Sequence, residues 1–203
     1  MNNWTEQVVK KLQDEAKESY GMFEQEESIQ DLTNKVIEVL PLGGLILELG
    51  CGFGRIFGIL LKKNKNIKYI GYDTSEPMLA SAKNTYPDYK TSFVFRDITL
   101  PAISDNPDIV IVNEVLIHLP PDTQKKVIES LNSIAPKHIF LTIQVGNSKV
   151  ETVGKEDQIF FNVIQDETEF ISYVESTLNA KHVESKYYDL IPGVRKCAMY
   201  FTK

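Results

Sequence analysis

The sequence predicts a single α/β domain, in which helices cover both faces of a doubly wound, mostly parallel sheet. Through the middle of the chain, short apolar runs of strand length alternate with helical segments, as in consecutive βαβ units. A glycine-rich turn follows the first of these strands, where open α/β sheets bind ligands. At 203 residues, the chain can bury one substantial core but is too short for two ordinary domains.

Helical periodicity dominates the first forty residues. Apolar residues recur at helical spacing from Trp4 to Leu12 and again from Ile29 to Leu40. The sequence PLGG at residues 41–44 then ends the second helix. We therefore expect residues 1–41 to form a helical cap ahead of the core.

The core is expected to span residues 42–143 and to hold five strands. The fourth, at residues 108–113, is almost wholly apolar, which is typical of a strand buried on both faces. Pro77 fits the first turn of a helix, where its missing N–H is not needed. We place the other strands at residues 45–47, 67–72, 92–95 and 138–143, and the helices between them at residues 56–61, 77–85 and 121–134.

The pattern changes in the C-terminal segment, residues 144–203. Residues 144–158 read as irregular, and residues 167–178 read as a helix. Two last strands, at residues 181–188 and 196–201, flank a turn and should add an antiparallel hairpin to the edge of the sheet. The prediction is thus a seven-stranded sheet within one domain that covers residues 1–203.

Composition argues against several classes of protein. A formal net charge of −6 does not suit a surface that grips a phosphate backbone, and no apolar run is long enough to cross a bilayer. The charged N-terminus lacks a signal-peptide core, and Cys51 and Cys197 are too few for a disulfide framework. We expect a cytoplasmic monomer or homodimer that binds no nucleic acid, membrane or metal.

The glycine-rich turn at residues 48–54 reads ELGCGFG. Glycine lets the backbone turn sharply and lets a ligand approach without a Cβ in the way. A dinucleotide site would need G-x-G-x-x-G, but here the third glycine comes one residue early and Arg55 stands in a glycine position. The spacing resembles the first motif of class I S-adenosylmethionine-dependent methyltransferases, E/D-x-G-x-G-x-G. The alternative is a plain strand-to-helix turn.

Acidic residues also follow the second and third predicted strands. The resemblance implies that Asp73 accepts hydrogen bonds from the ribose, and that residues 74–78 form the segment after this acid. It also implies that Asp97 accepts from the adenine amino group, beside the backbone N–H of Ile98. Alone, Asp97 would be read as a cap or turn residue. We expect Glu48, Asp73 and Asp97 to converge on one adenosyl group.

Residues 113–120, NEVLIHLP, resemble the N-E-V-L-x-H-[LI]-P segment of small-molecule methyltransferases, which borders the methionine part of the cofactor. The resemblance makes Asn113 and Glu114 candidates to contact the ammonium group or to position a substrate, although Glu114 could instead cap its turn. His118 is the candidate general base, since the ordinary pKa of histidine suits proton transfer near neutrality. A structural role for His118 is favoured, because methyl transfer often needs no dedicated base.

Arg55 could pair with the cofactor carboxylate, with Glu114 or with a surface acid, and the sequence does not rank these. Tyr20 lies in a segment that resembles the tyrosine-containing cap of the family, and Phe160 and Phe161 are candidates for a substrate wall. The cofactor-binding set implied by the resemblance is Tyr20, Glu48, Gly50, Cys51, Gly52, Gly54, Arg55, Asp73, Thr74, Met78, Asp97, Ile98, Asn113 and Glu114.

The resemblance implies a Rossmann-like fold and a direct in-line transfer of a methyl group from S-adenosyl-L-methionine to a nitrogen or oxygen of a small molecule. Sequence segments typical of enzymes that methylate nucleic-acid amino groups, pyrimidine carbons or arginine are missing from the chain. Three alternatives stay open. They are a non-catalytic cofactor-binding regulatory module, a methyltransferase that acts on protein or RNA, and a nicotinamide-dependent oxidoreductase.

Overall fold

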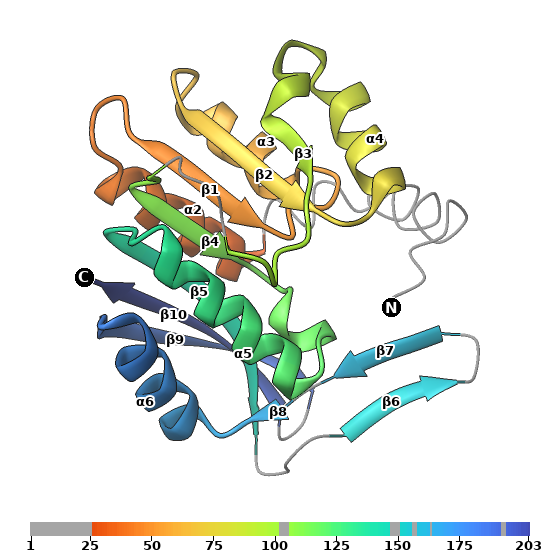
Figure 1. The fold of residues 1–203 in the computed structure, drawn as a ribbon, viewed down its shortest axis with the longest axis vertical. Coiled ribbons are helices and arrows are strands. Elements are labelled where there is room, and N and C mark those ends of the chain that lie inside the picture. The colour runs from red at the N-terminus through yellow and green to blue at the C-terminus, as the bar shows by residue number, and fades with distance from the viewer. Residues whose placement is uncertain (1–25, 102–105, 147–150, 156–157, 163, 192–193) are drawn as a thin grey trace.

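The computed structural model describes residues 26–101, 106–146, 151–155, 158–162, 164–191 and 194–203, and its elements are labelled in Figure 1. The strands are β1 (Leu45–Leu49), β2 (Lys68–Asp73), β3 (Phe93–Phe95), β4 (Ile109–Val112), β5 (His138–Gly146), β6 (Glu151–Lys155), β7 (Gln158–Asn162), β8 (Ile164–Gln165), β9 (Lys181–Ile191) and β10 (Val194–Thr202). The α-helices are α2 (Glu27–Val39), α3 (Arg55–Lys63), α4 (Glu76–Thr85), α5 (Pro121–Ser130) and α6 (Glu167–Leu178). Short 3₁₀ helices are η1 (Pro87–Ser92), η2 (Leu116–His118) and η3 (Leu131–Ser133).

The main sheet confirms the predicted fold class. Its strands follow the order β3-β2-β1-β4-β5-β10-β9, and β8 pairs beside β5. Strands β1 to β5 run parallel, while β10 is antiparallel to both β5 and β9. The order reverses between β1 and β4, and this switch point is where doubly wound sheets bind ligands. The fold is Rossmann-like.

The C-terminal hairpin enters the sheet by its last strand. Strand β10 pairs with β5 along its whole length, from His138 opposite Thr202 to Gly146 opposite Val194. The hairpin therefore puts β10 inside the sheet and leaves β9 at the edge, as Figure 1 shows. Because β10 occupies one edge of β5, β8 pairs with Gln144 and Val145 on the opposite edge, beyond the end of β4.

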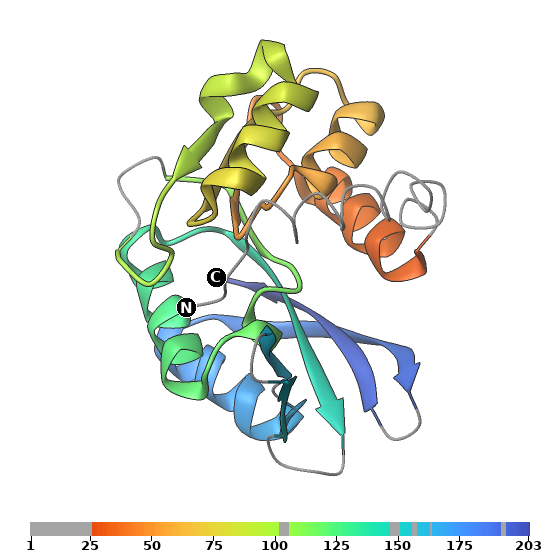
Figure 2. The same ribbon diagram turned by 90° about the vertical axis from the view of Figure 1, so that its right-hand side faces the viewer.

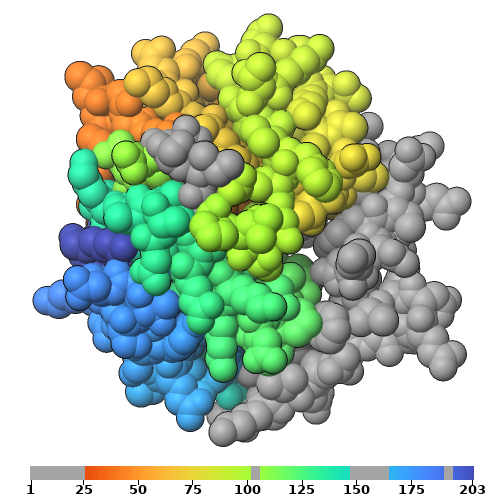
Figure 3. Space-filling model, viewed as in Figure 1, coloured from red at the N-terminus to blue at the C-terminus, as the bar shows by residue number. Residues whose placement is uncertain are grey.

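Apolar side chains fill both faces of the sheet. One core lies beneath α2, α3 and α4 and includes Ile46, Phe57 and Ile111. The other lies beneath α5 and α6 and includes Val110 and Leu141. Figure 2 shows α2 and α3 on one side of the strands with α5 and α6 on the other, and Figure 3 shows α5 and α6 adjacent on one face. None of the helices in the described ranges has the length and apolar character needed to span a bilayer.

The structure differs from one sequence-based prediction, and another falls outside the described residues. The prediction that residues 144–158 are irregular is wrong, since β5 continues to Gly146 and β6 pairs with β7 in a separate two-stranded sheet. Strand β6 has the sequence ETVGK, with one apolar residue followed by a glycine, so it lacks the alternation that marks a half-buried strand. The helix expected from Trp4 to Leu12 lies outside the described residues, whereas the second expected helix is α2.

Candidate functional site

The glycine turn between β1 and α3 adopts a conformation that needs glycine. Gly50, Gly52 and Gly54 all have positive φ angles, of 76°, 53° and 82°. A Cβ on Gly50 would collide with Val115, and one on Gly54 would press against Tyr86 and Phe93. Among the residues that the structure describes, a Cβ on Gly52 would meet nothing within 4 Å. Gly52 is therefore the point of the turn at which a ligand can approach the backbone.

Asp73, the last residue of β2, is tied to this turn. Its Oδ2 accepts the N–H of Gly52 at 2.8 Å, and its Oδ1 accepts the N–H of Ser75 at 2.8 Å. Burial raises the pKa of Asp73, and these backbone donors offset part of that rise. Thr74 is exposed beside it, whereas Met78 is buried in α4 and donates its N–H to the Ser75 Oγ at the helix N-cap.

Asp97 follows β3 in an exposed turn, and its Oδ1 accepts both the N–H of Thr99 at 2.9 Å and the Thr99 Oγ1 at 2.7 Å. This is the turn-capping geometry that the residue type alone suggests. The carbonyl of Ile98 accepts a hydrogen bond from Ser130 in α5, which fixes the backbone next to Asp97. Within the described ranges, Oδ2 of Asp97 has no hydrogen-bond partner.

Glu48, which comes just before the glycine turn in the sequence, is buried. Its side chain in β1 is 2% exposed and accepts a hydrogen bond of 2.5 Å from the hydroxyl of Tyr69. Burial raises the pKa of Glu48 to about 8, against the opposing effects of Tyr69 and Arg55. Cys51 is buried in the same turn, and burial likewise raises the pKa of its thiol. The expected convergence of Glu48 with Asp73 and Asp97 on one adenosyl group stays a prediction.

The end of β4 is held by the neighbouring strand. Thr142 in β5 accepts the backbone N–H of Glu114 at 2.5 Å and donates to Oδ1 of Asn113 at 3.3 Å. Glu114 has a φ of 56°, a left-handed conformation that costs a non-glycine residue roughly 1–2 kcal/mol. Strain of this kind is kept where the surrounding contacts enforce it, and it concentrates at functional sites.

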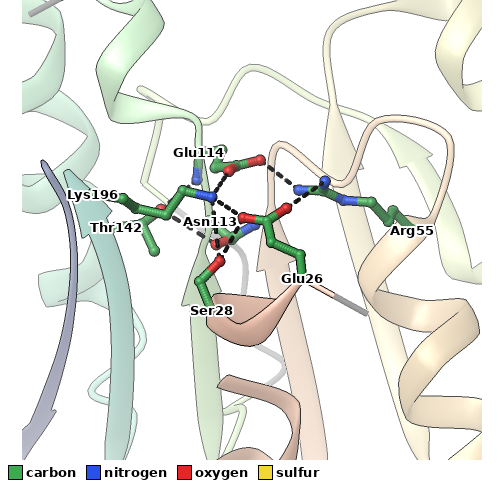
Figure 4. Close-up of polar contacts among 7 residues, drawn as sticks. All are labelled: Glu26, Ser28, Arg55, Asn113, Glu114, Thr142 and Lys196. Atoms are coloured by element: carbon green, nitrogen blue, oxygen red, sulfur yellow. Dashed lines mark hydrogen bonds and ion pairs between the residues drawn. The ribbon is translucent and has the colours of Figure 1, made fainter. Parts of the chain in front are cut away.

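Four charged side chains, including that of Glu114, meet at the end of β4, as Figure 4 shows. Arg55 binds Glu114 at 2.5 Å and lies 3.8 Å from Glu26, the residue that precedes α2. Lys196 in β10 contacts the carboxylates of both Glu26 and Glu114, and it lies 3.3 Å from the hydroxyl of Ser28. We call Glu26, Arg55, Glu114 and Lys196 the ion cluster.

The two cations of the ion cluster determine the protonation state of Glu114. Burial alone would raise the pKa of this carboxyl, but Arg55 and Lys196 lower it to about 2. Glu114 is thus a carboxylate at any physiological pH, and it is a poor proton acceptor. Of the sequence-based alternatives for Arg55, the structure shows the pairing with Glu114.

His118 ends η2, the turn that follows Glu114. Its backbone N–H binds the carbonyl of Val115 at 3.0 Å, and Gln124 in α5 donates to the carbonyls of Leu116 and Leu119 at 2.7 and 3.0 Å. Gln124 therefore fixes the turn that carries His118. Tyr20 lies outside the described residues, and for Phe160 and Phe161 the structure describes only the backbone of β7.

Comparison with known proteins identifies the core. Residues 47–136 match the model of a family described as "Methyltransferase domain". This stretch of the chain is similar to that family. The match covers the glycine turn, Asp73, Asp97 and the segment from Asn113 to His118, but it excludes Glu26 and Lys196.

Two curated relatives are similar in sequence to part of this chain. Trans-aconitate 2-methyltransferase of Variovorax paradoxus is 31% identical over 135 residues, which are 65% of this chain and 50% of that protein. Carboxy-S-adenosyl-L-methionine synthase 1 of Yersinia pseudotuberculosis is 25% identical over 123 residues, which are 57% of this chain and 51% of that protein. The chain spans about half the length of the curated relatives it matches.

Solved structures confirm the fold of the matched residues and of the strands that follow them. The 1,6-didemethyltoxoflavin-N1-methyltransferase of Burkholderia thailandensis, crystallised with its substrate and S-adenosylhomocysteine, aligns with a TM-score of 0.68. The alignment covers 97% of this chain and 87% of that one at 13% sequence identity. A likeness at this identity extends to the fold alone.

Sequence reasoning missed Glu26, Gln124, Thr142 and Lys196 as parts of the site. Lys196 and Arg195 are adjacent in an otherwise largely apolar strand, and nothing in the sequence tells which of them faces inward. Glu26 and Lys196 are 170 residues apart in the chain, so their contact leaves no local pattern.

Proposed function

We propose that this chain is an S-adenosylmethionine-dependent methyltransferase that methylates a nitrogen or oxygen of a small molecule. The observation that carries the proposal is the open side of Gly52, in a turn of three positive-φ glycines at the switch point of the sheet. Relatives named for transfer to trans-aconitate and to 1,6-didemethyltoxoflavin support a small acceptor. We further propose a single cytoplasmic domain, a monomer or homodimer, that acts without a nucleic-acid partner.

The polar groups around Gly52 fit an adenosyl group. Each carboxylate oxygen of Asp73 accepts one backbone N–H and keeps a lone pair, so both can accept from a ribose diol. Oδ2 of Asp97 is available to an adenine amino group, and the fixed backbone at Ile98 can meet the ring. Glu48 supports the turn through Tyr69, so its part is to position the loop.

The methionine end of the cofactor would lie along Asn113, Glu114 and Arg55. The Glu114 carboxylate gives this end a negative charge that suits an ammonium group, and Arg55 holds that carboxylate in place. The cofactor supplies a methyl group on sulfonium, which a nucleophile can attack in line with the departing thioether. Asn113, Thr142 and Glu114 then orient the reactants, and His118 is the proposed base only for an acceptor that must lose a proton.

Calorimetric titration tests the proposal. We expect S-adenosylmethionine and S-adenosylhomocysteine to bind with one site each, and NAD⁺ to show no binding, since Arg55 stands where a dinucleotide loop has glycine. Binding of NAD⁺ in place of the sulfonium cofactor would overturn the proposal. Incubation with methyl-labelled cofactor and a metabolite extract then separates an enzyme from a binding module, because a module transfers no label.

Asp73→Ala is expected to weaken binding of S-adenosylhomocysteine about 5- to 150-fold, which corresponds to roughly 1–3 kcal/mol for lost hydrogen bonds. The dissociation constant from calorimetry checks this, after circular dichroism has shown that the variant is folded. Asp88→Ala, at an exposed site in η1, is the matched control and should bind as the wild type does. Equal affinity of both variants would remove Asp73 from the ribose site.

A further inference from the structure

The face of the sheet that is apolar beneath α2 becomes polar at the carboxyl end of β5. Phe140 belongs to the apolar core on that face, and strand alternation puts Thr142 and Gln144 on the same face. Lys196 pairs directly opposite Gln144 on β10 and reaches the ion cluster on this face. Thr142, Gln144 and Lys196 are 3%, 8% and 6% exposed, so this polar layer is buried.

The charges next to this layer are balanced. The ion cluster holds two carboxylates and two cations, and each cation lies against both carboxylates. An anionic ligand would have to share Lys196 or Arg55 with carboxylates already bound to them, at a cost in desolvation and repulsion. The polar layer therefore suits a ligand group that carries no charge.

The side chain of Gln144 carries an unsatisfied hydrogen-bond acceptor in this layer. Its Oε1 is buried, and within the described ranges it accepts no hydrogen bond. A buried carbonyl oxygen without a donor is destabilising, so a site that keeps one is suited to a ligand that donates. An amide carbonyl accepts hydrogen bonds but cannot take up a proton near neutral pH.

Resting on the proposed function, we propose that Gln144 binds the methyl acceptor, and that the acceptor is an uncharged nitrogen nucleophile that donates an N–H to Oε1 of Gln144. The polar groups that adjoin Gln144 favour nitrogen over oxygen. Thr142 is neutral, Lys196 is paired with two carboxylates, and Glu114 stays a carboxylate that does not take up protons. A neutral nitrogen needs no base before it attacks, whereas a hydroxyl does.

The reaction then balances without a further reactant. The nitrogen lone pair forms the new N–C bond while the methyl C–S bond breaks, and its electron pair stays on sulfur as the thioether. The product nitrogen is positively charged and releases its N–H proton to water after transfer. Gln144 holds the N–H that remains and so orients the lone pair toward the methyl group.

Transfer of label from methyl-tritiated S-adenosylmethionine to a defined panel tests the acceptor class. The nitrogen acceptors are aniline, benzimidazole and benzylamine, and the oxygen acceptors are phenol, benzyl alcohol and benzoate. We expect label in the nitrogen acceptors, with the rate for benzylamine rising with pH as its free amine forms. This result is read on the wild-type protein and does not depend on how a variant folds.

Gln144→Met keeps the length of the side chain and removes the carbonyl. It should lower kcat/KM for the nitrogen acceptors about 10- to 100-fold and leave the dissociation constant of S-adenosylhomocysteine within twofold. Gln30→Met, the same change at a partly exposed site in α2, is the control and should leave both unchanged. Label in the oxygen acceptors alone, label in no acceptor, or an unaffected Gln144→Met enzyme would each overturn the proposal. Wild-type protein that fails to bind S-adenosylhomocysteine would instead overturn the proposed function.

Discussion

Lys196→Met is expected to lower the free energy of unfolding by about 3–5 kcal/mol at pH 7, because it removes one member of a buried group of charges. Lys196 is 6% exposed and contacts the carboxylates of both Glu26 and Glu114. Methionine fills a similar volume but leaves these two carboxylates facing each other with only Arg55 between them. Urea unfolding followed by circular dichroism measures the loss.

Lys186→Met is the matched control for this prediction. Lys186 forms an ion pair of 3.2 Å with Asp31, but its side chain is 48% exposed, so the same substitution should cost less than about 1 kcal/mol. The double variant Lys196→Met/Glu114→Gln should recover part of the lost free energy of unfolding, since it also removes one of the two carboxylates left without Lys196. Equal stability of Lys196→Met and Lys186→Met would show that the ion cluster contributes no more than a surface pair.

Glu48→Gln is expected to change how stability depends on pH. The pKa of Glu48 is raised from its ordinary value of 4.5 to about 8, so the unfolded chain releases this proton at lower pH than the folded one does. Stability from the protonated group is complete below about pH 4.5 and is lost as the pH rises through about 8. From pH 5 to pH 9, the stability of wild type relative to the variant should fall by about 3–5 kcal/mol.

Urea unfolding of both proteins at pH 5, 7 and 9 provides the measurement. The difference between the two proteins is the readout, since other groups titrate equally in both. Glu38→Gln, at a glutamate whose side chain is 65% exposed in α2, should show no such trend with pH. Parallel curves for wild type and Glu48→Gln would mean that Glu48 is ionised in the folded protein.

The main sheet could be predicted from the sequence because its strands are buried. Ile109–Val112 in β4 is apolar at every position, and α6 was predicted with its observed bounds from helical spacing alone. The β6–β7 hairpin was missed because its first strand has a single apolar residue. Strand pairing there comes from a short connection between segments whose side chains give no periodic signal.

The candidate site could be predicted only in part. Strand ends meet at one edge of a parallel sheet, so acidic residues after β2 and β3 could be placed near the glycine turn. Glu48 lies one residue before the end of β1. Its buried side chain is hydrogen-bonded to the hydroxyl of Tyr69, and sequence spacing alone does not tell a buried carboxyl from one that faces a ligand. The ion cluster joins residues from α2, α3, β10 and the end of β4, and no local pattern encodes such a contact.

The position of β10 between β5 and β9 has a consequence for biosynthesis. Of the described strands, β10 is made last, and it is an interior strand. While the chain emerges from the ribosome, β5 therefore keeps an unpaired edge until β10 is made. Lys196 is part of β10, so its ion pair with Glu114 can form only after β10 has been made. Nascent chains should therefore form the part proposed to bind the adenosyl group before the part proposed to bind the acceptor.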